Sequence, residues 1–177
     1  MSGVNHPEEL RRAIRDIPDF PKPGIVFRDI SPILSNAELF RQVVDALAAE
    51  AEKLSPGKIV GIDARGFLFG AAVAYKLGLG FIPVRKKGKL PYRTIGYSYV
   101  LEYGRADMEM HIDAVKAGEK VVLVDDLLAT GGTSAAAVHL IKQLGASVEA
   151  ALFFIELVDL GGRKQLSGVP VQTLIQF

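Results

Sequence analysis

Two adjacent carboxylates and a small polar turn lie together in the segment VVLVDDLLATGGTS, residues 121–134. Asp125 and Asp126 follow four apolar residues directly, and the turn comes three residues later. The turn consists of Ala129, Thr130, Gly131, Gly132 and Thr133. A glycine turn that opens a helix can direct backbone N–H groups at a phosphate, and the two threonines add hydroxyl donors. Because carboxylates repel phosphate, Asp125 and Asp126 need another partner, either a sugar diol or a metal ion.

The elements around this segment predict where its polar groups lie. The run 121–124 is typical of a strand buried on both faces, and the alanine-rich run 134–144 predicts a helix that Gly145 ends. In a parallel sheet, ligands bind beyond the carboxyl ends of the strands, which is where the turn falls. The segment lacks the Gly-Lys-Ser/Thr ending of a P-loop and the spacing of a dinucleotide fingerprint. A phosphorylated sugar is therefore the predicted ligand; the alternative is a buried strand whose carboxylates are solvated or cap a turn.

A second strand, predicted over 58–62, leads into Asp63-Ala64-Arg65-Gly66 and then a helix over 67–77. Because it repeats the order of strand, polar turn and helix, Arg65 should face the same crevice, where its guanidinium suits a diphosphate. The alternative is a surface salt bridge between Asp63 and a neighbour. A third strand, 80–84, runs into Arg85-Lys86-Lys87-Gly88-Lys89, which either collects phosphate charge or forms a solvated face.

The remaining segments carry weaker signals. Leu10, Ile14 and Ile17 predict an N-terminal helix that Pro18 ends, and residues 25–33 read as an irregular loop or an edge strand. A long amphipathic helix is predicted over 36–54. Residues 92–107, rich in tyrosine and polar residues, predict a hairpin or a flexible lid. Further strands are predicted over 148–156 and 169–177, the position of the last remaining open.

Composition sets the limits of the function. The chain has 177 residues, of which 49% are apolar, enough to bury the core of one domain. Its formal net charge of +1 is too small to attract nucleic acid or an anionic membrane surface, so neither is an expected partner. It contains no cysteine, which is compatible with a reducing cytoplasm, and no apolar run approaches the roughly 20 residues of a membrane span. The alternating strands and helices predict a single-domain α/β fold with a mainly parallel twisted sheet flanked by helices.

The segment 121–134 resembles the phosphoribosyl pyrophosphate (PRPP) signature of the type I phosphoribosyltransferases. Three further stretches resemble the adenine-specific branch of that family: FPKPGIVFRDISP at 20–32, GIDARGFLFG at 61–70 and LEYGRADMEM at 101–110. The resemblance runs over nearly the whole chain and in the family's order. It implies the type I fold, with residues 1–35 as an N-terminal helix and a hood over the purine. It also implies transfer of a 5-phosphoribosyl group from PRPP to N9 of adenine, giving AMP and pyrophosphate.

The same resemblance implies roles for individual residues. Asp125 and Asp126 would hold the ribose hydroxyls, and the turn residues 129–133 would hold the 5′-phosphate. Adenine would be read by main-chain groups of the hood, and Glu102 would serve as the acid/base. The pyrophosphate group would be bound by Arg65, which is also a catalytic residue, and by Arg85, Lys86 and Lys89. The adenine would be bound by the main chain of Val26 and Arg28.

The family pattern further implies Mg²⁺ held mainly by PRPP rather than by protein ligands, a homodimer, and a cis peptide bond that we place at Ala64–Arg65. Two other functions fit part of the pattern. One is a PRPP-binding regulator without catalysis, although the chain shows neither an added DNA-binding domain nor a basic surface. The other is an enzyme for another base, such as hypoxanthine, xanthine or orotate, against which the hood sequence at 20–32 argues.

Overall fold

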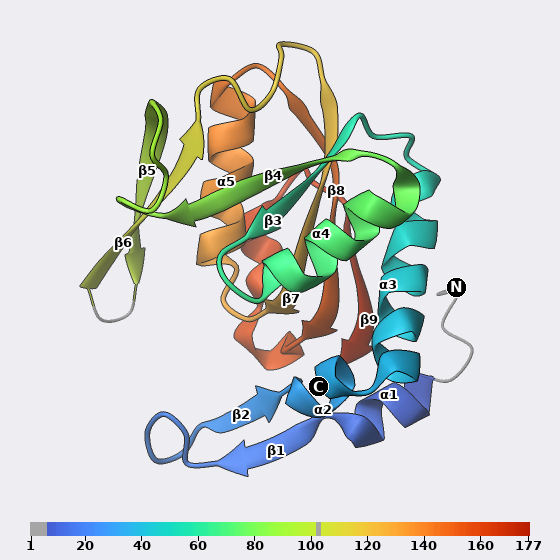
Figure 1. Cartoon of the computed structure of the whole chain (residues 1–177). Coiled ribbons are helices and arrows are strands. Elements are labelled where there is room, and N and C mark those ends of the chain that lie inside the picture. The colour runs from blue at the N-terminus through green and yellow to red at the C-terminus, as the bar shows by residue number, and fades with distance from the viewer. Residues whose placement is uncertain (1–6, 102–103) are drawn as a thin grey trace.

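The computed structural model describes residues 7–101 and 104–177 of the chain. It shows the predicted α/β fold, with one seven-stranded sheet between layers of helices and a small hairpin below it (Figure 1). The strand order in the large sheet is β5-β6-β4-β3-β7-β8-β9. Five neighbouring strands of this sheet run parallel: β4 (Gly80–Lys86), β3 (Lys58–Ile62), β7 (Lys120–Leu128), β8 (Ser147–Glu156) and β9 (Val171–Gln176).

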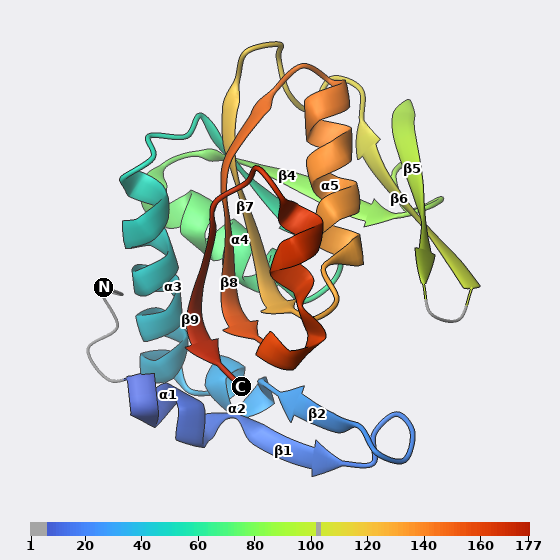
Figure 2. The ribbon, with the colours of Figure 1, turned by 180° about the vertical axis from the view of Figure 1, so that it is seen from behind.

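Helices cover both faces of this parallel core. On one face lie α3 (Ala37–Glu52) and α4 (Gly66–Leu77), and on the other lies α5 (Gly132–Gln143), as Figures 1 and 2 show from opposite sides. The central strand β7 contributes side chains to the core on both faces of the sheet. Val122 and Val124 pack under α3 and α4, and Val121 and Leu123 pack under α5. This alternation explains why residues 121–124 are all apolar.

Local signals set the ends of the helices. The side chain of Asn36 accepts hydrogen bonds from the backbone N–H groups of Glu38 and Leu39, at 3.0 and 3.1 Å, and so caps α3. Such a cap contributes about 1 kcal/mol. At the end of α5, Gly145 follows the C-cap residue Leu144 with a φ of +84° and so stops the helix, as its sequence position predicts. No helix within the described ranges 7–101 and 104–177 is long and apolar enough to cross a membrane.

The N-terminal region, for which the name hood is kept below, is a separate small layer of the structure. It comprises α1 (Pro7–Ala13), strands β1 (Arg15–Pro18) and β2 (Val26–Asp29), and the short helix α2 (Ser31–Ser35). The prediction of a helix reaching Ile17 was wrong, since the helix ends at Ala13 and Ile17 pairs with Phe27 across an antiparallel ladder. Antiparallel pairing with β2 accounts for the difference, because it holds all of Arg15–Pro18 in an extended conformation, which Pro18 also favours in Ile17.

Two further segments settle positions that the sequence left open. The tyrosine-rich region forms the antiparallel strands β5 (Thr94–Leu101) and β6 (Gly104–His111), which extend from the edge of the sheet beside β4. The last strand, β9, pairs with β8 at the opposite edge. It is preceded by the 3₁₀ turns η1 (Val158–Leu160) and η2 (Gly162–Leu166). The end of β9 lies beside the hood (Figure 2).

Candidate functional site

A cavity of about 320 Å³ opens at the carboxyl ends of β3 and β7. Its wall combines the turn after β3 with the end of β7 and the loop into α5. The lining residues are Ile62, Asp63, Ala64, Arg65, Asp125, Asp126, Leu127, Ala129, Thr130, Gly131, Gly132, Thr133 and Ser134. Because β3 and β7 are parallel neighbours, their carboxyl ends meet at one edge, and the two segments selected in the sequence converge.

The two carboxylates lie inside β7, not beyond its end. The strand continues to Leu128, so the expectation that Asp125 and Asp126 follow the strand was wrong. The two residues are 8% and 5% exposed, and the backbone N–H of Asp126 donates to Oδ1 of Asp125 at 2.9 Å. Pairing with β8 extends the strand, since Asp125 lies opposite Phe153 and Leu128 opposite Glu156. Hydrogen bonding along this ladder outweighs the polarity of the two side chains.

Burial sets the protonation of this pair. Loss of hydration raises the pKa of Asp125 well above its usual range, and the neighbouring charge of Asp126 adds to the rise. Burial also raises the pKa of Asp126, although the positive charge of Arg65 opposes the increase. In the unliganded protein, therefore, ionising these two buried carboxyl groups is unfavourable. A ligand with hydroxyl donors or positive charge would stabilise their ionised forms.

We expect Asp125→Asn to stabilise the unliganded protein at pH 8. The pKa of Asp125 is higher in the folded than in the unfolded protein, so its carboxyl group ionises more readily in the unfolded chain. The free energy of unfolding therefore falls as the pH rises through the folded-state pKa. The amide removes this loss and keeps the oxygen that accepts from Asp126. The melting temperature should rise by roughly 2–4 °C per kcal/mol recovered, and the gain should shrink as pH falls through the folded pKa. Thermal unfolding at pH 5 and 8 measures this, with exposed Asp113→Asn as control; no gain at pH 8 would contradict it.

Gly66 allows the two halves of the wall to meet. It is the first residue of α4, immediately after Arg65, and a Cβ atom at this position would lie 2.5 Å from Oδ1 of Asp125. No side chain fits at that distance, so only glycine lets α4 begin against β7. The close approach holds Arg65 beside the carboxylate pair.

The polar turn has the geometry of an anion site. Gly131 occupies the N-cap position of α5 with a φ of +84°, a conformation that favours glycine, and the unpaired N–H groups of the first helical turn follow it. The hairpin reaches the same turn, because the hydroxyl of Tyr99 lies 2.8 Å from Oγ1 of Thr133. The ring of Tyr99 also covers Gly132, where a Cβ would lie 3.1 Å from two ring atoms.

Arg65 connects the cavity to the hood. Its Nε atom lies 2.8 Å from Oδ2 of Asp126, an ion pair whose N–H does not point at the oxygen. Buried Oδ2 therefore accepts no hydrogen bond from any described residue and keeps its capacity for a ligand. On the other side, the guanidinium carbon of Arg65 lies 5.1 Å from the ring centre of Phe27 in β2.

In the hood, Val26 and Arg28 are two residues apart on β2, so their N–H and C=O groups point to the same edge of the strand. The hood sheet has only two strands in the described chain, so one edge of β2 has no strand partner. The side chain of Arg28 is engaged elsewhere, because it pairs with Asp16 and lies 4.0 Å over the ring centre of Phe177. The side chain of Arg28 is therefore held by other residues of the chain.

The basic run lies outside the cavity wall and begins inside β4, because pairing with β6 carries this strand through Arg85 and Lys86, two residues beyond its predicted end. Nε of Arg85 contacts Oδ2 of Asp63 at 3.1 Å, and Nη1 donates to the backbone oxygen of Lys89 at 3.2 Å. Asp63 thus forms a salt bridge with Arg85, as the alternative interpretation of the loop 63–66 predicted. Arg65 nevertheless lines the cavity, as the first interpretation predicted. Lys86 and Lys89 are exposed. Binding of pyrophosphate by these three basic residues stays a prediction.

The cis peptide bond was predicted one residue too late. It lies between Asp63 and Ala64, and not between Ala64 and Arg65. The backbone explains the shift: Asp63 still donates its N–H to Val84, while Arg65 already has the helical φ and ψ of −71° and −28°. The chain therefore has to reverse before Arg65.

Four residues that shape this site were not selected from the sequence: Phe27, Gly66, Tyr99 and Gly162, the last because a Cβ there would lie 2.3 Å from the backbone oxygen of Ala129 in the turn. Phe27 could have been selected, since it lies between Val26 and Arg28 in the hood motif. The glycines and Tyr99 matter through contacts with distant segments, which no local pattern reports. The proposed acid/base residue Glu102 lies outside the described residues.

Comparison with known proteins places the chain in a family. Residues 31–167 match the phosphoribosyl transferase domain. The adenine phosphoribosyltransferase of Carboxydothermus hydrogenoformans is 57% identical over 169 residues, 96% of this chain and 99% of that protein. The crystal structure of the enzyme of the same name from Thermoanaerobacter pseudethanolicus superimposes with a TM-score of 0.94 at 51% identity, covering 97% and 99% of the two chains.

A third relative was solved with ligands. Adenine phosphoribosyltransferase from Saccharomyces cerevisiae, complexed with D-2,5-dideoxy-2,5-imino-altritol 1,6-bisphosphate and adenine, has a TM-score of 0.91 at 43% identity. The superposition covers 96% of this chain and 98% of the yeast chain. Matches of this extent, together with the diacid, arginine and glycine turn around one cavity, lead to one conclusion. The chain belongs to the adenine phosphoribosyltransferases.

Proposed function

We propose that this protein transfers the 5-phosphoribosyl group of PRPP to N9 of adenine, giving AMP and pyrophosphate. The observation that carries the proposal is the convergence of Asp125, Asp126, Arg65 and the turn 129–133 on one cavity. A phosphorylated sugar needs acceptors for its hydroxyls and donors for its phosphate, and this wall offers both. The yeast relative solved with adenine and a bisphosphate supports the same assignment.

In this proposal the turn anchors the 5′-phosphate and the diacid anchors the ribose. The first N–H groups of α5 and the hydroxyls of Thr130 and Thr133 would bind the phosphate, at the positive end of the helix dipole. Asp125 and Asp126 would accept hydrogen bonds from the ribose hydroxyls. Holding both ends of the sugar fixes C1 relative to the purine, which replaces part of the entropic cost of bringing two substrates together.

The diacid and Arg65 would also act on the reacting bond. When the bond between C1 and the pyrophosphate oxygen breaks, its electron pair leaves with pyrophosphate and positive charge develops on the ribose ring. The buried carboxylates would stabilise that positive charge, since a low-dielectric site strengthens the interaction. Arg65 would bind the departing pyrophosphate. Arg85, Lys86 and Lys89 are proposed to add positive charge nearby.

Mg²⁺ is proposed to enter with PRPP, bound mainly by the oxygens of PRPP. Within residues 7–101 and 104–177 the structure shows no cluster of three or more His, Cys, Asp or Glu side chains that could hold a metal ion. The residues present are compatible with such an ion, because the carboxylates of Asp125 and Asp126 carry the hard oxygen atoms that Mg²⁺ prefers. Oδ2 of Asp126 accepts no hydrogen bond from the described chain. The ion would neutralise charge on the pyrophosphate group.

Adenine is proposed to bind under the hood, against the main chain of Val26 and Arg28. A backbone C=O would accept from the exocyclic amine, and a backbone N–H would donate to N1. A 6-oxo purine carries hydrogen on N1 and an oxygen in place of the amine, so both contacts would fail and leave buried polar groups unpaired. After N9 bonds to C1 it must lose its proton, and Glu102 is the proposed acceptor.

The direct test is to follow both products from PRPP and adenine with Mg²⁺ present. We expect AMP and pyrophosphate to appear in equal amounts, and Asp126→Asn to lower the rate at least 100-fold by removing charge from the diacid. Pyrophosphate released without AMP would show hydrolysis of PRPP and would contradict the proposed transfer.

A homodimer is proposed as the working unit, in the cytoplasm. The exposed side of α4 carries Leu68 and Tyr75, which are 44% and 91% exposed, and burying such apolar side chains would favour association. Light scattering coupled to gel filtration should give twice the chain mass of 19.1 kDa. Tyr75→Glu should weaken the dimer, and a monomer at micromolar concentration in the unmodified protein would contradict the proposal.

A further inference from the structure

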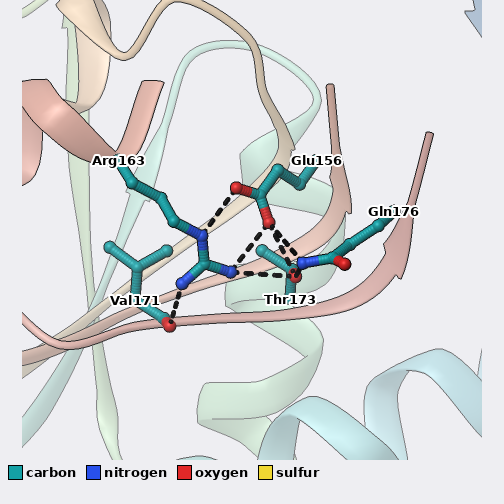
Figure 3. Close-up of polar contacts among 5 residues, drawn as sticks. All are labelled: Glu156, Arg163, Val171, Thr173 and Gln176. Atoms are coloured by element: carbon teal, nitrogen blue, oxygen red, sulfur yellow. Dashed lines mark hydrogen bonds and ion pairs between the residues drawn. The ribbon is translucent and has the colours of Figure 1, made fainter. Parts of the chain in front are cut away.

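A buried carboxylate with four side-chain donor contacts lies next to the cavity without lining it. Glu156, the last residue of β8, is 3% exposed. Nε and Nη2 of Arg163 donate to its two oxygens at 2.6 and 2.7 Å, the paired geometry of the strongest ion pairs (Figure 3). The hydroxyl of Thr173 and the side-chain amide of Gln176, both from β9, each donate to Oε2 at 3.0 Å.

Arg163 belongs to a different element from its partners. It is the second residue of η2, and its Nη1 atom donates to the backbone oxygen of Val171 at 2.8 Å. One guanidinium therefore joins η2 to the end of β8 and to the start of β9. The hydrogen bonds from Arg163 are the largest influence that lowers the pKa of Glu156, so the ion pair is fully formed at neutral pH.

The residue before Arg163 supports the phosphate-binding turn. A Cβ at Gly162 would lie 2.3 Å from the backbone oxygen of Ala129, and a Cβ at Gly131 would lie 2.4 Å from the backbone oxygen of Gly162. The two loops thus approach each other backbone to backbone, and the side chains of Leu128 and Gln165 pack against the same two glycines. Any displacement of η2 is passed directly to the turn 129–131.

We propose that Arg163 and Glu156 are positioning residues for phosphoribosyl binding: their ion pair holds η2 against the turn 129–131, and so fixes the N–H groups that bind the 5′-phosphate. This inference rests on the proposed function, in which that turn binds the phosphate of PRPP. Neither residue lines the cavity, so neither touches the substrate. Their contribution is to the affinity for the phosphorylated sugar.

The central variant is Arg163→Met, which keeps much of the side-chain volume but removes the charge and all donors. Glu156 is then left buried with two neutral donors, and η2 loses its link to β8 and β9. We expect the dissociation constant for ribose 5-phosphate and the KM for PRPP to rise at least tenfold, with the KM for adenine changing less than threefold. Arg163→Lys keeps the charge but not the two-pronged contact and should fall between.

Lys58→Met is the matched control. Lys58 forms a partly buried ion pair with Glu119 at 3.1 Å, and it lies at the first residue of β3, the opposite end of the sheet from the cavity. Removing it should lower stability but leave both KM values unchanged. All variants are compared by calorimetric titration with ribose 5-phosphate at a temperature where circular dichroism shows each to be folded, and by steady-state kinetics.

Three outcomes decide the inference. Weaker ribose 5-phosphate binding in Arg163→Met, an intermediate effect in Arg163→Lys and none in Lys58→Met would support it. Unchanged binding in both Arg163 variants, or an equal loss in Lys58→Met, would overturn it and leave the proposed function intact. An unmodified protein that binds neither ribose 5-phosphate nor PRPP would instead contradict the proposed function, and this inference with it.

Discussion

Gly132→Asp should abolish measurable PRPP binding and leave the fold intact. Gly132 lines the cavity as the first residue of α5, where the 5′-phosphate is proposed to bind, so a carboxylate would repel the ligand at close range. Gly132 does not have the positive φ of Gly131, so aspartate can adopt its backbone conformation. We expect the dissociation constant for PRPP to rise at least 1,000-fold, which calorimetric titration measures directly.

Gly132→Ala separates charge from crowding in this experiment. A Cβ at this position would lie 3.1 Å from the ring of Tyr99, a contact that both substitutions share. The alanine variant should therefore lose affinity only about tenfold or less. Unchanged PRPP affinity in the aspartate variant would remove the turn 129–133 from the phosphate site.

Arg65→Met should lower kcat/KM roughly 100- to 1,000-fold, the usual effect of losing one charged group that stabilises a leaving group. Arg65 is the arginine among the residues that line the cavity, and it also pairs with buried Asp126. The same change leaves Asp126 without its positive partner, so its pKa should rise further and the rate should fall more steeply at low pH. Pre-steady-state and steady-state kinetics between pH 6 and 9 measure both effects.

Arg85→Met is the comparison for this prediction. Arg85 contacts Asp63 at the edge of the cavity and does not line it. We expect a loss of about tenfold, smaller than for Arg65. An equal loss in the two variants would mean that the positive charge of the region matters and not the position of Arg65.

Much of the fold and the centre of the site were predictable from the sequence, because both depend on local patterns. The apolar run 121–124 marks a strand buried on two faces, and the turn 129–133 marks the start of a helix. Parallel strands then bring the turn after β3 to the same edge. Strand order alone therefore brings Arg65 beside Asp125 and Asp126, without any knowledge of side-chain packing.

The errors and omissions have the opposite cause, since they depend on contacts between distant segments. The extent of β7 was underestimated because pairing with β8 carries the strand through two carboxylates that look like its end. The strand β1 was read as helix because its partner is β2 in the hood. The support of Gly131 by Gly162, and of η2 by Glu156, joins residues 7 to 31 positions apart through backbone approach and burial.

The choice of base shows whether this site makes AMP from PRPP and adenine. Turnover of PRPP should be measured with adenine, hypoxanthine, guanine and xanthine in parallel, with Mg²⁺ and with a chelator in its place. The hood and the cavity together predict nucleotide formation from adenine alone, and only with Mg²⁺ present. Comparable turnover of a 6-oxo purine would contradict main-chain recognition of adenine by β2, and no turnover of any base, with PRPP still bound, would contradict the assignment of the site to catalysis.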